Sequence, residues 1–277
     1  MTRATVEPIV LVAHGSRDPL AAVATRALVR AVEAASPGTT VRAGFLDHAG
    51  PRPGQVLRAL EAAGHRSATL VPLLLTAAYH GRVDIPGAVA TARDAGLRMP
   101  VRVTEVLGPT GGAVPGSLLG GLLRRLAESG VTAAGRSVPD GIVVPASAAA
   151  AGGRRAGAGV DGVVLAAAGT RDAAARRTVD TAAAALGAVL GVSCLAGYAS
   201  AAGPTVGEAV HRLRERGADR VAVAAYFLAP GRLYGVAAAA ARAAGVVAVA
   251  APLTDAPEVA RLVLDRAAAG GPDRTTG

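Results

Sequence analysis

A nine-residue motif occurs twice in the chain, 154 positions apart, and this repeat limits the folds that the chain can adopt. VLVAHGSRD, at residues 10–18, matches VLAAAGTRD, at residues 164–172, at six positions. Thr170 replaces Ser16 conservatively, whereas Ala168 replaces His14. An apolar run followed by glycine and by an aspartate that opens an alanine-rich segment is typical of a buried parallel strand leading into a helix. The sequence therefore predicts a duplicated α/β unit with one intact copy of the motif.

The turn residues repeat as well, at an offset of 153. The shared positions are Ala43-Gly44 with Ala196-Gly197, Gly50-Pro51 with Gly203-Pro204, Gly54 with Gly207, Leu60 with Leu213, and Gly64 with Gly217. Repeated glycines and prolines preserve backbone turns, which indicates that the scaffold was duplicated and kept. We expect an N-terminal unit over 1–134, a linker rich in Ala, Gly and Arg over 135–159, and a C-terminal unit over 160–277. Within the linker, Ile142 to Val144 could form a short strand.

Strand and helix patterns alternate along the first unit. After the strand that starts at Ile9, strands are predicted over 40–46, 68–75 and 101–107, and helices from 19 to the Pro37-Gly38 pair and over 53–63, 84–95 and 115–129. This alternation predicts right-handed crossovers and a parallel sheet covered by helices on both faces. The expected fold is thus α/β, with two three-layer αβα units that each contain a four-stranded parallel sheet ordered 2-1-3-4.

Composition excludes several classes of protein. Hydrophobic residues make up 51% of the chain, yet no apolar run approaches the roughly 18 residues of a membrane span. The apolar stretch near the start follows Glu7 and Pro8 and is too short for a signal peptide, and the single Cys194 excludes an internal disulfide. We therefore expect a soluble, cytoplasmic protein without a membrane partner.

All 29 basic residues are arginine, and the chain contains no lysine. A Walker phosphate loop and Schiff-base chemistry both need a lysine, so neither is expected. The net charge of +9 could favour binding of nucleic acid, but aromatic residues make up only 2% of the chain and no nucleic-acid-binding motif is present. A small polyanionic substrate and a merely arginine-rich composition explain the charge equally well, and we expect no nucleic-acid partner.

Candidate functional side chains follow three neighbouring strands. His14 follows the first predicted strand, Asp47 ends the second, and His80 follows the third. In a sheet ordered 2-1-3-4 these ends flank the point where strand order reverses, which is where ligands bind. Two imidazoles and a carboxylate suit a transiently bound divalent transition metal, and neutral imidazole can accept protons near pH 7.

The second copy has lost this set of side chains. Ala168 stands for His14 and Ser200 for Asp47, and the loop that holds His80 is shortened to Ala229, Pro230 and Gly231 before Arg232. The second copy keeps the turn residues and loses only the residues that can bind a metal or a proton. This selective loss favours a functional role for His14, Asp47 and His80 in the first copy. A structural role for loop histidines is the alternative.

The residues of the first unit resemble a known family. AHGSRD after the first strand, GFLD at the end of the second, and LVPLLLTAAYHGRVDIP across the third strand and its loop are similar to the sirohydrochlorin chelatases, the class II, ATP-independent cobalt and iron chelatases. The resemblance covers residues 8–110 strongly, and the remainder matches as the family's divergent second half. It implies two duplicated chelatase-like domains and a lyase that inserts a divalent metal into sirohydrochlorin during siroheme or cobalamin biosynthesis.

The resemblance also implies roles for individual residues. The family's two histidines, here His14 and His80, bind the metal and assist its insertion, and an acidic residue, usually Glu and here Asp47, contributes. The metal, Fe²⁺ or Co²⁺ with Ni²⁺ as a third candidate, is a substrate, and no permanent cofactor is implied. Arg17 and Arg82 could hold substrate carboxylates through bidentate hydrogen bonds, although both could equally be plain surface arginines.

Several alternatives remain at this point. Ser16 could position substrate, but it lacks the G-x-S-x-G setting of a nucleophile. The first turn lacks the G-x-G-x-x-G of a dinucleotide-binding domain, and Ala13 stands where a histidine phosphatase would have arginine. A non-catalytic carrier of metal or tetrapyrrole is the serious alternative to an enzyme. The two units could pair around one cleft, so a monomer and a homodimer are both compatible with the sequence.

Overall fold

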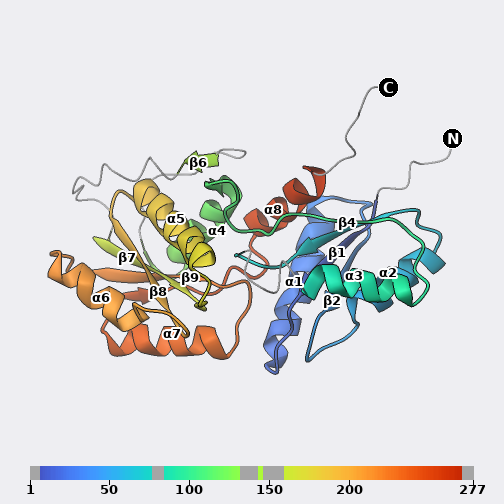
Figure 1. Cartoon of the computed structure of the whole chain (residues 1–277). Coiled ribbons are helices and arrows are strands. Elements are labelled where there is room, and N and C mark those ends of the chain that lie inside the picture. Colours follow the sequence, from blue (N-terminus) through green and yellow to red (C-terminus); the bar gives the residue numbers. More distant parts are fainter. Residues whose placement is uncertain (1–6, 77–83, 132–142, 146–158, 270–277) are drawn as a thin grey trace.

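The computed structural model describes residues 7–76, 84–131, 143–145 and 159–269. Within these ranges strands and helices alternate as the sequence predicts (Figure 1). The elements of the first half are β1 (Ile9–Ala13), α1 (Pro19–Ala35), β2 (Val41–Phe45), α2 (Pro53–Ala62), β3 (Ala68–Pro72), α3 (Ile85–Asp94), β4 (Val101–Val103), β5 (Ala113–Pro115) and α4 (Gly116–Glu128). Those that follow are β6 (Val143–Pro145), β7 (Gly162–Ala167), α5 (Ala173–Leu190), β8 (Ser193–Tyr198), α6 (Val206–Glu215), β9 (Val221–Tyr226), α7 (Arg232–Ala243), β10 (Ala248–Val249) and α8 (Pro257–Ala268).

Each half contains a four-stranded parallel sheet, and the predicted strand order is confirmed. The sheets are ordered β2-β1-β3-β4 and β10-β9-β7-β8, which is the same 2-1-3-4 arrangement in both copies. The predicted third and fourth strands were too long at their carboxyl ends. The apolar residues there, such as Leu107, are buried in irregular segments beyond the hydrogen-bonded ladder.

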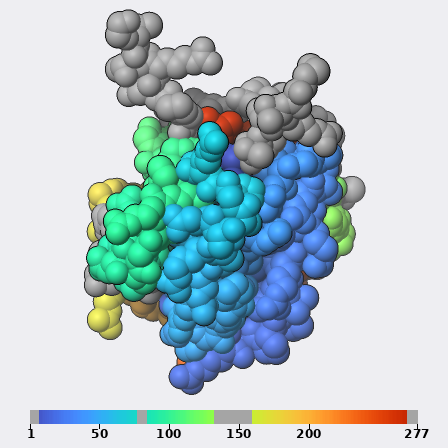
Figure 2. All heavy atoms as spheres, turned by 90° about the vertical axis from the view of Figure 1, so that its right-hand side faces the viewer, coloured from blue at the N-terminus to red at the C-terminus, as the bar shows by residue number. Residues whose placement is uncertain are grey.

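Alternate residues of each central strand face opposite layers of helices. In β1, Ile9 and Leu11 point toward α1, whereas Val10 and Val12 pack with apolar residues of α2 and α3. Figure 2 looks onto the N-terminal half from its outer side, and the blue to green colours show that most of the visible surface comes from this half. Each half is thus the three-layer αβα unit that the sequence predicts.

The helix that ends each half packs on the other half. α8 lies against α1 and β3 of the first sheet, whereas α4 lies against β9 and α5 of the second, and the two helices also contact each other (Figure 1). The inner faces of both sheets therefore share one apolar core that runs through α4 and α8. This exchange fixes the two halves side by side and sets the cleft between them.

Polar contacts reinforce the exchanged helices. Arg124 of α4 binds both carboxylate oxygens of Glu258 of α8 at 2.6–2.9 Å. Across the first sheet, the Arg102 Nη2 donates to the Ala267 carbonyl oxygen at 2.6 Å. These charge-assisted hydrogen bonds bridge the two halves and favour a single arrangement of them.

Most of the predicted linker over 135–159 lies outside the described residues. Within it, β6 pairs antiparallel with β5, one residue beyond the position of the short strand considered at 142–144. In the described part of the chain, no helix is long and apolar enough to cross a membrane.

Candidate functional site

The first site residues lie where β1 and β2 end side by side. Ala13 pairs with Phe45 at the ends of these strands, and just beyond them the Asp47 backbone N–H donates to the His14 carbonyl oxygen at 2.7 Å. Gly15 follows with φ +94°, and a Cβ on it would lie only 1.8 Å from the Asp47 carbonyl oxygen. Only glycine lets the two loops approach this closely. The structure therefore brings His14 and Asp47 together at one edge of the sheet, as the strand order requires.

The Asp47 carboxylate is held in its charged form by its neighbours. The His48 backbone N–H donates to its Oδ1 at 2.8 Å, and this bond is the main cause of an Asp47 pKa below the ordinary value. The charges of His48, Arg52 and His14 lower the pKa further, with the Arg52 guanidinium 3.7 Å and the His48 Nε2 3.4 Å from the carboxylate. Half of the Asp47 side chain is exposed, so a bound cation could reach it.

His48 and Arg52 were missed as site residues by the sequence analysis. His48 adopts φ +59°, which turns its backbone N–H onto the Asp47 carboxylate. Arg52 precedes α2 and also donates to the Leu46 carbonyl oxygen, so it ties α2 to the end of β2. The available signal was their closeness in sequence to Asp47, which says nothing about which way each side chain points.

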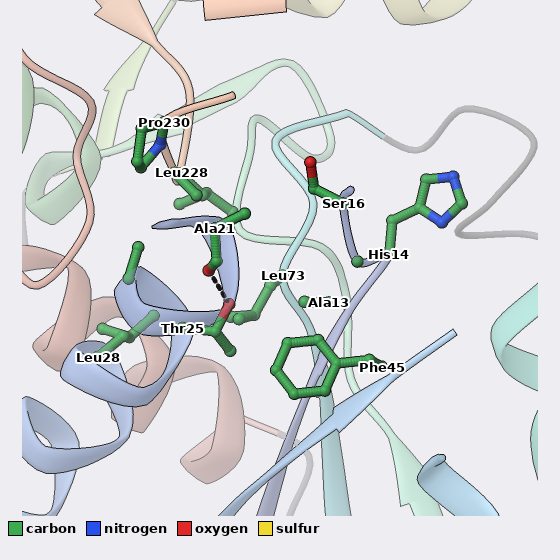
Figure 3. Close-up of a pocket in the computed structure, with 13 residues that line it drawn as sticks. Ala13, His14, Ser16, Ala21, Thr25, Leu28, Phe45, Leu73, Leu228 and Pro230 are labelled. Carbon is green, nitrogen blue, oxygen red and sulfur yellow. Dashed lines mark hydrogen bonds between the residues drawn. The ribbon is translucent and has the colours of Figure 1, made fainter. Parts of the chain in front are cut away.

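An apolar pocket of about 180 Å³ opens beside His14 and Ser16. Its walls come from α1, from the ends of β1, β2 and β3, and from the loop after β9 of the other half. The lining residues are Ala13, His14, Gly15, Ser16, Ala21, Ala24, Thr25, Leu28, Phe45, Leu73, Leu228, Ala229 and Pro230. The Thr25 hydroxyl donates to the Ala21 carbonyl oxygen at 3.0 Å, so the polar atom in the wall is satisfied within the helix (Figure 3). A pocket of this size and lining suits an apolar, ring-sized group.

The His14 side chain lies at the rim of this pocket. It is exposed, and Figure 3 shows its imidazole pointing away from Thr25 and Leu28 on α1. Ser16 accepts a hydrogen bond on its Oγ from the Asp18 backbone N–H at 3.1 Å. Asp18 in turn caps α1, accepting from the Leu20 backbone N–H at 2.9 Å. These bonds set the path of the loop, so the position of His14 is defined by α1 as well as by β1.

The structure describes only some of the remaining predicted site residues. Arg17 is exposed next to Ser16. His80 and Arg82 lie outside the described residues, so their roles stay predictions. Among the residues that the structure describes, no group of three or more His, Cys, Asp or Glu side chains is arranged to hold a metal. Of the side chains predicted to bind the metal or assist its insertion, the structure therefore describes His14 and Asp47.

The second copy keeps the backbone of this site and uses its side chains differently. Gly169 has φ +95°, and its Cβ would lie 1.8 Å from the Ser200 carbonyl oxygen, which repeats the geometry at Gly15. The Ser200 hydroxyl donates to the Ala168 carbonyl oxygen at 2.9 Å, and Arg176 donates to the Thr170 carbonyl oxygen at 3.0 Å. Polar groups of this loop thus bond to the loop's own backbone.

Comparisons with known proteins agree with the duplicated architecture. The family model described as CbiX matches residues 8–114 and again residues 162–269. Among solved structures, SirB from Bacillus subtilis with Fe³⁺ is similar with a TM-score of 0.72 and 19% identity over 95% of this chain and 94% of that one. SirB from Bacillus subtilis subspecies spizizenii, a sirohydrochlorin chelatase in complex with cobalt, has a TM-score of 0.68 and 18% identity over 94% and 93%.

A third solved structure extends the comparison. A multi-domain protein from Deinococcus radiodurans with structural similarity to chelatases has a TM-score of 0.62 and 22% identity over 99% of this chain and 57% of that one. At these identities the likeness establishes the fold. A sequence search of curated proteins finds no match.

Proposed function

The chain belongs to the CbiX family, and from that membership we propose that it is a lyase that inserts a divalent metal, Fe²⁺ or Co²⁺, into sirohydrochlorin. The observation that carries the proposal is that His14 lines an apolar pocket between the two halves and that Asp47 lies next to His14, joined to it by a backbone hydrogen bond. The similar SirB structures hold Fe³⁺ and cobalt, which supports a metal as the substrate. The reaction belongs to siroheme or cobalamin biosynthesis in the cytoplasm and needs no permanent cofactor.

The chemistry requires a metal donor and a base on one face of the macrocycle. Two pyrrole N–H protons leave as the divalent metal enters, so the charge is balanced and no electron is transferred. The His14 imidazole, with that of His80, binds the incoming metal and takes up the departing protons. The Asp47 carboxylate is ionised near neutral pH, and the His48 N–H bond lowers its pKa further, so it holds negative charge near the metal as it arrives.

The surroundings of the site suit a flat tetrapyrrole with carboxylate side chains. Leu20 and Val23 in the first turns of α1 are 57% and 53% exposed, and Leu233 and Val236 in the first turns of α7 are 38% and 45% exposed. Exposed apolar side chains beside a pocket indicate a binding surface. The macrocycle faces contact these residues, whereas Ser16, Arg17 and Arg82 bind polar groups at its edge.

Turnover distinguishes this enzyme from a carrier. Sirohydrochlorin in large excess over protein is mixed with Fe²⁺, Co²⁺ or Ni²⁺ in turn, and its absorption spectrum is followed. The proposal predicts that each protein molecule metallates many macrocycles and that His14→Ala abolishes most of the rate, whereas the control His211→Ala, an exposed histidine of α6, retains it. Metallation that stops at one macrocycle per protein would identify a carrier.

A further inference from the structure

The loop after β9 brings the second half onto the site of the first. Leu228, Ala229 and Pro230 line the pocket together with His14. Gly231 follows, and a Cβ on it would lie 3.7 Å from the Ser16 hydroxyl oxygen, so the two loops are in contact. Arg232, the first residue of α7, therefore stands beside the loop that carries His14 and Ser16.

Arg232 differs from several other arginines of the second half. Arg176, Arg214 and Arg220 each donate to backbone carbonyl oxygens, and these bonds give them a structural role. Arg232 is exposed and has no hydrogen-bond or ion-pair partner among the residues that the structure describes. The surrounding stretch, residues 221–254, contains no Asp or Glu. An unneutralised guanidinium at the edge of an apolar pocket is suited to an anionic group on a ligand in that pocket.

We propose that Arg232 binds a carboxylate of the tetrapyrrole, so that the second half supplies a substrate-binding residue to the site of the first. The inference rests on the proposed function and adds to it a residue from the copy that lost its histidine. The planar guanidinium matches a carboxylate with two parallel hydrogen bonds. Leu233 and Val236, exposed on the same helix, lie beyond Arg232 and contact the apolar face of the ring system.

The shortened loop explains why this residue can reach the site. In the first half, the equivalent connection carries the predicted His80 and Arg82. In the second half, only Ala229, Pro230 and Gly231 precede α7, which starts directly against the Ser16 loop. Loss of the histidine loop thus left an arginine at the junction of the two halves.

Binding of metal-free sirohydrochlorin to the purified full chain tests this inference. The dissociation constant is measured by absorption titration for wild type, Arg232→Ala, Arg232→Lys and the control Arg242→Ala. Arg242 is an exposed arginine at the other end of the same helix, so its removal changes the net charge equally. We expect Arg232→Ala to weaken binding about tenfold, because a hydrogen bond to a charged group is lost. Arg232→Lys should recover part of the affinity, and Arg242→Ala should match wild type.

Salt and turnover supply further readouts. The difference between wild type and Arg232→Ala should shrink in high salt, because an exposed ion pair is screened. At saturating sirohydrochlorin the kcat of Arg232→Ala should match that of wild type, since only substrate binding is changed. A folded Arg232→Ala variant with wild-type affinity, or an equal loss in Arg242→Ala, would overturn the inference.

The result separates this inference from the proposed function. If wild type binds sirohydrochlorin with Arg232-dependent affinity but never metallates it, the enzymatic function is wrong and the Arg232 contact stands. If turnover is normal and the affinity is independent of Arg232, the function stands and the inference falls. A wild-type protein that binds no tetrapyrrole overturns both.

Discussion

Gly15→Ala tests the close approach on which the candidate site depends. Gly15 has φ +94°, and an alanine Cβ there would lie 1.8 Å from the Asp47 carbonyl oxygen. Real Cβ contacts below 3.0 Å are essentially never seen, so that carbonyl would have to move by about 1 Å. The substitution therefore separates the loops that carry His14 and Asp47 without removing either side chain.

The stability cost follows from two contributions. An alanine at positive φ costs about 1–2 kcal/mol. Moving the loops apart also breaks the 2.7 Å bond from the Asp47 N–H to the His14 carbonyl oxygen, which costs about 0.5–1.5 kcal/mol. We expect Gly15→Ala to lower the free energy of unfolding by about 1.5–3.5 kcal/mol, or the Tm by roughly 3–14 °C. Urea unfolding and thermal melts measure both quantities.

Gly169→Ala is the matched control, because the second copy has the same geometry. Its φ is +95°, and its Cβ would lie 1.8 Å from the Ser200 carbonyl oxygen. Both variants should lose similar stability. Assayed well below both Tm values, Gly15→Ala should lose about 100-fold in turnover, since a displacement of about 1 Å misplaces reacting groups, whereas Gly169→Ala should remain active. Equal losses of turnover, or a Gly15→Ala variant as stable as wild type, would refute the reasoning.

Three further predictions concern other contacts. Asp47→Asn should fold normally and lose about tenfold in turnover, whereas Asp47→Glu should be tolerated. The higher turnover of wild type relative to Asp47→Asn should persist as pH falls, until the pH passes the lowered Asp47 pKa. Turnover of the three proteins measured as a function of pH checks this. Glu258→Gln should cost at most about 1 kcal/mol near neutral pH, because the pair with Arg124 is partly exposed. Burial favours the neutral form of Glu258, but the hydrogen bond from Arg124 lowers the Glu258 pKa overall. The stabilisation from this pair is therefore present above the ordinary glutamate pKa and is lost as pH falls through the lowered pKa of Glu258. Urea unfolding at neutral and acid pH measures this stabilisation. Tyr226→Phe removes the hydroxyl that donates to the Leu75 carbonyl oxygen of the other half at 3.0 Å. Urea unfolding should show that the free energy of unfolding falls by about 1–3 kcal/mol. An unchanged free energy of unfolding would show that water replaces the hydroxyl.

Local patterns were enough to predict the sheets and the edge where the site lies. The apolar run before His14 and the strand predicted over 40–46 place His14 and Asp47 at neighbouring strand ends, and the structure confirms this placement. The alternation of strands and helices predicted parallel sheets, the order 2-1-3-4 was assumed for them and is confirmed, and the repeated glycines correctly indicated that the second half has the same backbone.

Contacts between the halves could not be predicted in the same way. The apolar face of α4, with Leu118, Leu122 and Leu126, shows that the helix is buried but does not say against which sheet. The pocket depends on this packing, because Leu228 and Pro230 reach it from the other half. Long-range packing of this kind depends on the shapes of two folded surfaces, which residue periodicity does not encode.

A Co²⁺ titration most directly tests the central claim that one site of two was kept. We predict one transition-metal site in wild type, and none of comparable affinity after the double change His14→Ala and His80→Ala. Ala168→His should not create a second site, because the Ser200 hydroxyl is bonded to the Ala168 carbonyl oxygen and the shortened loop before Arg232 supplies no other donor. A second site of comparable affinity that survives the double change would contradict the account and show that the C-terminal copy also binds metal.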